Sequence, residues 1–181
     1  MTDRDVELSV LTRGLDQAAA LLGSVTNDDL TRATPCHDWS TADLVDHLVA
    51  APRRFARMVR GEEVDWSAST PRVAGDRAEV FRSAADELLE AWDGAPADAP
   101  MGPDWQTAEI AVHTYDLATA LGRPTAELDA EVAERGLAFM EANLTPDNRG
   151  AAFEPEQAPH EGADAYQRIA AFAGRSLTPS R

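Results

Sequence analysis

The sequence predicts an all-α protein that folds as a single domain over residues 1–181. Alanine is abundant and runs of β-branched residues are scarce, a composition that favours helix. Apolar residues recur at helical spacing in several stretches, and glycine or proline interrupts the pattern between them. We therefore expect a helical core over about residues 5–143, followed by a C-terminal loop and short helix over about residues 144–181.

Six helices are expected in chain order, over about residues 5–22, 41–60, 75–93, 104–121, 127–143 and 163–174. The first ends at Gly23. The second follows Ser40, whose side chain can cap a helix, and Asp43 lies in its first turn, where the helix dipole favours a carboxylate. Gly61 ends the second helix, and a loop containing Pro71 separates it from the third.

The later helices are bounded by the same kinds of residue. Residues 94–100 contain two prolines and a glycine and precede the fourth helix, which ends at Gly122 and Pro124. Leu128 contributes to the apolar face of the fifth helix, and a proline-rich loop separates that helix from the sixth. Residues 177–181 are expected to be frayed.

Composition excludes several classes of function. The formal net charge is −16, and so acidic a surface repels the phosphates of nucleic acids and anionic membranes. No window approaches about 18 uninterrupted apolar residues, so we expect no membrane span. The acidic N-terminus lacks the features of a signal peptide, and the single cysteine, Cys36, excludes an internal disulfide. A cytoplasmic location is the expectation.

Three residues predict a metal site: His47 in the second helix, and Glu109 with His113 in the fourth. Glu109 and His113 are four residues apart and share one helical face between rows of apolar residues, so they are expected to face inward. Two imidazoles and a carboxylate with an open fourth position are the ligand set of catalytic zinc sites. Zinc is the first expectation, and nickel, iron or manganese would also suit these donors.

Each member of this set also has an alternative interpretation. His47 could be a hydrogen-bonded core residue, and Glu109 with His113 could be an exposed helix pair. Asp116 lies on the same row of the fourth helix. It could orient His113, serve as a fourth ligand, or lie at the surface.

Cys36, Trp39 and Trp105 are candidates for the mouth of the site. Cys36 could be a reactive thiol, although a role as a small buried apolar side chain is preferred. The two tryptophans are expected to pack in the core or against the wall of the pocket. His37 and His160 lie in predicted loops and are expected to be solvated.

Two segments carry a resemblance to a known family. Residues 34–48, TPCHDWSTADLVDHL, resemble the T-P-C-x-x-W-x-x-x-D-L-x-x-H-L segment of the mycothiol-dependent maleylpyruvate isomerase N-terminal domain. Residues 109–117, EIAVHTYDL, resemble the E-x-x-x-H-x-W-D-L segment of that family, with Tyr115 where tryptophan is common. The two segments occur in the expected order.

The resemblance implies a DinB-like four-helix bundle with additional C-terminal helices and a non-sequential arrangement of its helices. It also implies a divalent metal held by His47, Glu109 and His113, and a low-molecular-weight thiol, notably mycothiol, whose thiolate would take the open metal position. The isomerase carries a further C-terminal domain that contributes to its active site. This sequence ends soon after the bundle, so we expect a substrate other than maleylpyruvate.

Three functional hypotheses follow. The first is a metal- and thiol-dependent transferase or isomerase that acts on a small electrophile. The second is a metal-dependent hydrolase, in which Asp116 is the next candidate for the base because Glu109 is a ligand. The third is a binding or stress-response protein whose structural metal has a fourth ligand from Asp116, His37 or Cys36. A small molecule or thiol is the expected partner, and the protein is expected to be a monomer or a homodimer.

Overall fold

The structure is a computed structural model that describes residues 2–36, 39–66, 68–96, 99, 102–149 and 153–176. The described residues form only helices, turns and loops, apart from one isolated β-bridge between Ala33 and Ser40. The helices are α1 (Asp3–Ser24), the 3-10 helix η1 (Asn27–Thr31), α2 (Thr41–Val59), α3 (Arg77–Asp93), α4 (Asp104–Ala120), the 3-10 helix η2 (Thr125–Glu127), α5 (Ala130–Asn143) and α6 (Ala165–Phe172). The all-α prediction is confirmed.

Capping residues set the helix that carries His47. The Ser40 side chain accepts a hydrogen bond from the backbone N–H of Asp43, and the Asp43 carboxylate accepts one from the backbone N–H of Ser40. This reciprocal capping box satisfies donors that the first turn leaves unpaired. At the other end Gly61 has φ +79°, a conformation that glycine adopts without steric cost. The predicted limits of α2 are confirmed within one residue.

Three predicted helix starts were too early. We expected the third helix from residue 75, but Gly75 has φ +90° and Asp76 caps α3 by accepting from the backbone of its first turn. We expected the fifth helix from residue 127, but Leu128 is extended and Asp129 caps α5. We expected the sixth helix from residue 163, but Asp164 caps α6. In all three places the capping carboxylate ends the preceding loop.

The first four helices form a bundle in which chain neighbours are not all spatial neighbours. Helix α1 packs against α3 and α4, and α2 packs against the same two helices. Helices α1 and α2 therefore lie across the bundle from each other, as do α3 and α4. This is the non-sequential arrangement that the resemblance implies.

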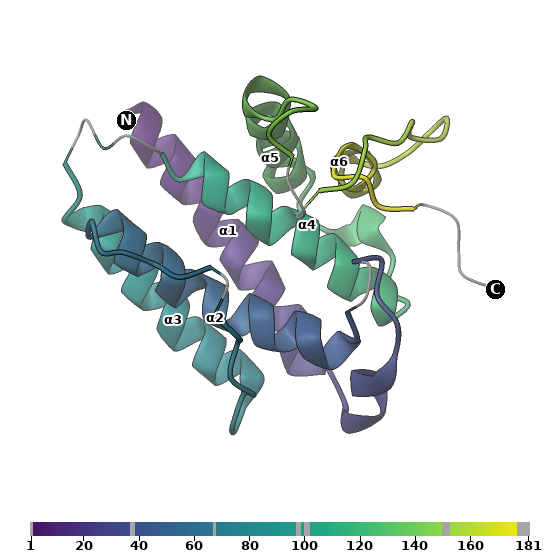
Figure 1. The fold of residues 1–181 in the computed structure, drawn as a ribbon, viewed down its shortest axis with the longest axis horizontal. Helices are drawn as coiled ribbons and strands as arrows, with labels where there is room; N and C mark the ends of the chain where they lie inside the picture. Colours follow the sequence, from purple (N-terminus) through teal and green to yellow (C-terminus); the bar gives the residue numbers. More distant parts are fainter. Residues whose placement is uncertain are drawn as a thin grey trace.

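Helices α5 and α6 cover the outer side of α4, opposite α2 and α3 (Figure 1). Because α4 is enclosed from both sides, most of its residues are buried, including the polar or charged His113, Thr114, Tyr115 and Asp116. Such burial requires each charged side chain on this helix to have a partner.

Two further predictions concern a membrane span and the C-terminal residues. No helix among the described residues is long and apolar enough to cross a membrane. Residues 177–181, which we expected to be frayed, lie outside the described residues.

Candidate metal centre

The packing of α2 against α4 brings the three predicted ligands together. His47 lies two turns into α2, and Glu109 and His113 are successive members of one row on α4. Glu109 Oε1 lies 3.1 Å from His47 Nε2 and 3.3 Å from His113 Nε2. The three donor atoms lie within 4.8 Å of one another. The two imidazole rings meet edge to face with their centroids 4.8 Å apart.

The charges of the three side chains are mutually compensating. Burial by itself would raise the pKa of Glu109, but His113 and His47 outweigh it and hold this pKa well below its usual range. Burial would lower the pKa of His113, but Glu109 and Asp116 outweigh it and raise this pKa to about 9. Without a cation the site is therefore a carboxylate paired with a protonated imidazole.

Asp116 supports His113 from the opposite side of the ring. Its Oδ2 lies 3.1 Å from His113 Nδ1, and the Asp116 side chain is fully buried. Asp116 also forms a two-pronged ion pair with Arg175, whose Nε and Nη2 each lie 3.1 Å from a carboxylate oxygen. A carboxylate so paired only accepts, so Nδ1 of His113 carries the donated hydrogen and Nε2 faces Glu109 and His47.

This placement excludes one interpretation of Asp116. A surface role is wrong, because Asp116 is among the most buried residues of α4. Its hydrogen bond to Nδ1 gives it the geometry of a residue that orients His113.

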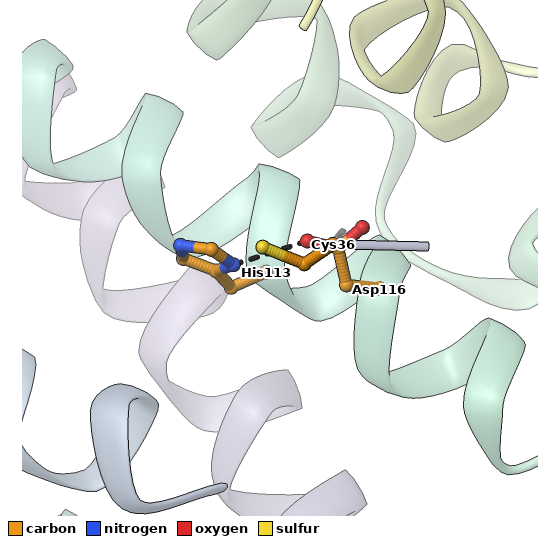
Figure 2. Close-up of side chains that lie close together, drawn as sticks. All are labelled: Cys36, His113 and Asp116. Atoms are coloured by element: carbon orange, nitrogen blue, oxygen red, sulfur yellow. Dashed lines mark hydrogen bonds and ion pairs between the residues drawn. The ribbon is translucent and has the colours of Figure 1, made fainter. Parts of the chain in front are cut away.

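Cys36 lies over the hydrogen bond between His113 and Asp116 (Figure 2). Its Sγ and one donor atom from each of those residues lie within 4.8 Å of one another. The turn that carries Cys36 is closed by the Thr34 hydroxyl, which lies 3.0 Å from the carbonyl oxygens of both Cys36 and Trp39. Burial, and then the Asp116 carboxylate, raises the pKa of the thiol to about 11. Cys36 thus lies near the site, but as a protonated and poorly nucleophilic thiol.

Trp39 covers the two imidazoles from the same turn. Its ring stacks on His113 at 5.7 Å and an interplanar angle of 20°, and it contacts His47 at 4.8 Å and 50°. Trp39 therefore packs directly on the rings of both predicted imidazole donors.

Trp105 belongs to a second aromatic group, the aromatic cluster of Phe55, Trp66 and Trp105. The ring of Trp105 lies 5.0 Å from Phe55 and 5.9 Å from Trp66. Because Trp105 precedes Glu109 by four residues on α4, the aromatic cluster begins one helical turn from the donor set. Trp66 remains 44% exposed although it is a large apolar residue.

Several hydrogen bonds attach the loop that carries Trp66 to α2. The Arg54 guanidinium donates to the carbonyl of Ala68 and the hydroxyl of Thr70. Asp46, the neighbour of His47, accepts from the backbone N–H of Val73 at 2.9 Å. The loop therefore holds its exposed tryptophan at a defined position beside the site.

Two site residues were missed in the sequence. Arg175 follows Gly174 at the end of α6, and nothing in its spacing indicates a partner 59 residues earlier. Trp66 lies in a loop without periodicity. Of the remaining candidates, His160 is exposed as expected, and His37 lies outside the described residues.

The donor set fits a divalent cation. Two adjacent helices provide two imidazole nitrogens, from His47 and His113, and one carboxylate oxygen, from Glu109. Zinc and similar cations bind donors of these kinds. The neighbouring group of Cys36, His113 and Asp116 fits poorly, because the Arg175 guanidinium already occupies the Asp116 carboxylate.

Comparison with known proteins places the chain in a family. Residues 11–118, which include Cys36 and all three predicted ligands, match the mycothiol maleylpyruvate isomerase N-terminal domain family. The chain is also 32% identical over 177 residues to uncharacterized proteins of Mycobacterium tuberculosis from strains CDC 1551 and H37Rv, covering 91% of this chain and 95% of each relative. No solved structure matches the chain significantly. The match over more than half of the sequence shows that this protein belongs to the mycothiol maleylpyruvate isomerase N-terminal domain family, with the DinB-like bundle that goes with it.

Proposed function

We propose that this protein binds a divalent cation through His47, Glu109 and His113 and uses it, together with a low-molecular-weight thiol such as mycothiol, to transfer or isomerise a small electrophile. The observation that carries this proposal is the convergence of the three donor atoms from α2 and α4 in a member of this family. Zinc is the preferred cation, with nickel, iron or manganese as alternatives for the same donors. We place the reaction in the cytoplasm, where small thiols are kept reduced.

A bound cation would supply Lewis acidity, which lowers the pKa of a thiol or water that it holds. The protein supplies orientation. Asp116 holds His113 by its Nδ1, and Trp39 packs on both imidazole rings. Both contacts fix the directions in which the two Nε2 atoms point, and so favour one geometry of the donor set.

The aromatic cluster is suited to bind the organic part of the thiol or substrate. It starts one turn from Glu109, and the loop of Trp66 holds an apolar ring at the surface, where its exposure is otherwise unfavourable. Arg54 lies over the Trp66 ring at 5.9 Å and adds a positive charge beside this apolar surface in an acidic protein. An apolar or aromatic ligand with a negatively charged group suits this combination.

The hydrolase hypothesis has weaker support. It needs a carboxylate base beside an activated water, yet Glu109 is one of the three donors. Asp116, the next candidate, lies on the Nδ1 side of His113 and is paired with Arg175. Neither carboxylate is therefore in position to accept a proton on the Nε2 side of the ring.

The hypothesis of a purely structural metal also has weaker support. It requires a fourth ligand from Asp116, His37 or Cys36. Asp116 is held by Arg175, Cys36 lies over the Nδ1 side of His113, and His37 lies outside the described residues. The two candidates that the structure describes are thus on the side of His113 away from Glu109, which favours an open position for an exchangeable ligand.

Cobalt substitution tests the proposal. We expect the protein to bind one Co²⁺, and addition of mycothiol to produce a sulfur-to-cobalt charge-transfer band. The Glu109→Gln variant, which keeps the size of the side chain and removes its charge, should lose both the tight binding and the band. Failure of the cobalt-loaded protein to respond to any low-molecular-weight thiol contradicts the thiol-dependent function, and failure to bind cobalt contradicts the metal site.

A second measurement concerns the aromatic cluster. We expect Trp66→Ala to weaken binding of mycothiol or of the substrate without changing the affinity for cobalt. Leu8→Ala is the control, because it changes a partly buried residue of α1 at the periphery of the core. Trp92→Phe would not serve, because the Trp92 ring donates a hydrogen bond to Gln106 in the core. Equal thiol binding by Trp66→Ala and the unmodified protein would remove the aromatic cluster from the proposal.

A further inference from the structure

Arg175 is a buried cation that the donor set itself does not require. It is 5% exposed, and its guanidinium faces Asp116 with Nε 3.1 Å from Oδ1 and Nη2 3.1 Å from Oδ2. Asp116 Oδ2 is in turn 3.1 Å from Nδ1 of His113. A chain of two contacts thus leads from Arg175, three residues beyond the end of α6, to a predicted metal ligand.

The end of α6 is built to deliver Arg175 to this position. The backbone N–H of Arg175 donates to the carbonyl of Ala170, and that of Gly174 donates to the carbonyl of Ala171. This Schellman motif turns the chain sharply back toward α4. Gly174 has φ +83°, and a Cβ there would lie 2.5 Å from the carbonyl oxygen of Glu154. Only glycine fits, so local structure at the end of α6 determines where the guanidinium lies.

We infer that Arg175 is a positioning residue of the metal centre, which holds Asp116 behind His113 and thereby fixes the direction in which His113 presents Nε2 to the cation. This inference rests on the proposed function, because it assumes that His113 is a ligand.

The contacts of Asp116 explain why such a residue is needed. An ionised carboxylate so close to a cation site is itself a suitable ligand, and it would be free to turn if only one of its oxygens were bound. Arg175 contacts both oxygens, which orients the plane of the carboxylate and balances its charge. Asp116 can then accept from Nδ1 without entering the donor set.

The inference also links the C-terminal helix to the site. Arg175 lies outside residues 11–118, the part of the chain that matches the family. Helix α6 packs against both α4 and α5, so the way α6 docks decides whether Arg175 reaches Asp116. Metal affinity is therefore expected to depend on a segment that contributes no ligand.

Three variants of the full chain test this inference by calorimetric titration with Co²⁺ and by the visible spectrum of the cobalt-loaded protein. Arg175→Met should weaken cobalt binding by about 10- to 100-fold, as removal of groups that support metal ligands commonly does. Arg175→Lys keeps the charge but cannot contact both oxygens in one plane, and should show a smaller loss with a changed spectrum. Arg168→Met is the matched control: Arg168 lies on α6, the helix that precedes Arg175, and pairs with Glu134 at the surface, so its loss should change affinity less than about twofold.

The spectrum separates a positioning role from a merely structural one, because it reports the geometry of the donors around cobalt. If both Arg175 variants fold and bind cobalt with the affinity and spectrum of the unmodified protein, the inference is wrong although the metal site stands. If Arg175→Met fails to fold, Arg175→Lys decides by the same criteria. If the unmodified protein does not bind cobalt, the proposed function fails and the inference fails with it.

Discussion

The two sides of the His113 ring carry similar side chains and differ in what they can bind. On the Nε2 side, Glu109 Oε1 lies between His113 and His47, and each contact is an imidazole with a carboxylate. On the Nδ1 side, Asp116 and Cys36 lie close to the ring, and the Arg175 guanidinium pairs with the Asp116 carboxylate. Each side offers three potential metal donors, with His113 belonging to both. Among the described residues, only the Nδ1 side also contains a permanently positive side chain, that of Arg175.

This difference shows how a protein can keep two acidic groups beside one histidine without placing both in a metal site. Burial makes an uncompensated carboxylate costly, so each of the two needs a positive partner. Asp116 has a permanent one in Arg175. Among the described residues Glu109 pairs with the imidazoles of His47 and His113, which lose their positive charge when they give up a proton, so a divalent cation could replace that charge.

The largest expected effect comes from removing a nitrogen donor on the Nε2 side. His113→Ala and His47→Ala should each abolish measurable binding of zinc, a greater loss than the about 10- to 100-fold that supporting residues cause. Titration of the metal-free protein by calorimetry measures this. His160→Ala is the control, since His160 is exposed and distant in sequence from the donors. Retention of tight binding by either donor variant would contradict the comparison between the two sides.

The next effect concerns the Nδ1 side and the stability of the fold. Arg175→Met should lower the free energy of unfolding by about 3–5 kcal/mol, because it leaves the Asp116 carboxylate buried without its cation. The double variant Asp116→Leu with Arg175→Met removes both charges and should recover much of this loss. Urea denaturation of the metal-free proteins checks both values. Equal stability of the single and double variants would show that the pair is not charge-coupled.

A smaller and graded effect is expected from pH. The folded-state pKa of His113 is about 9, above the ordinary value of 6.5, so its protonation stabilises the metal-free fold fully below pH 6.5, and this contribution is lost as pH rises through about 9. Metal binding needs the neutral ring, so affinity should rise about tenfold per pH unit between pH 7 and 9 as one proton is released. Titrations in buffers of different ionisation enthalpy measure that proton. Release of none at pH 7 would contradict the assigned charge state.

The smallest effect is expected at Cys36. Cys36→Ser should leave zinc affinity within about twofold and the free energy of unfolding within about 1 kcal/mol, because the thiol is protonated and lies outside the proposed donor set. Alkylation of the unmodified protein by iodoacetamide at pH 8 should be much slower than alkylation of a free thiol, since the pKa of about 11 leaves little thiolate. A loss of zinc affinity comparable to that of His113→Ala would make Cys36 a ligand.

Much of the fold was predictable because the interactions that define a helix are local. Ser40 and Asp43 cap α2 through contacts three residues apart, and Gly61 ends it through its own backbone conformation. The apolar rows on α4 indicated that Glu109 and His113 face inward, since residues four apart share a helical face. The largest error in a helix start was at Leu128, an apolar loop residue that continued the period of the helix that follows.

The sequence alone determined the helical class, the six helical segments and the three candidate donors, because periodicity, capping and donor chemistry are properties of neighbouring residues. Only the tertiary structure decided that Asp116 lies behind His113, that Cys36 faces the same side, and that Arg175 reaches Asp116 from the end of α6. These positions depend on how α2, α4 and α6 pack together. No spacing along the chain encodes a contact between residues 59 positions apart, because packing between helices is set by the whole core rather than by any one segment.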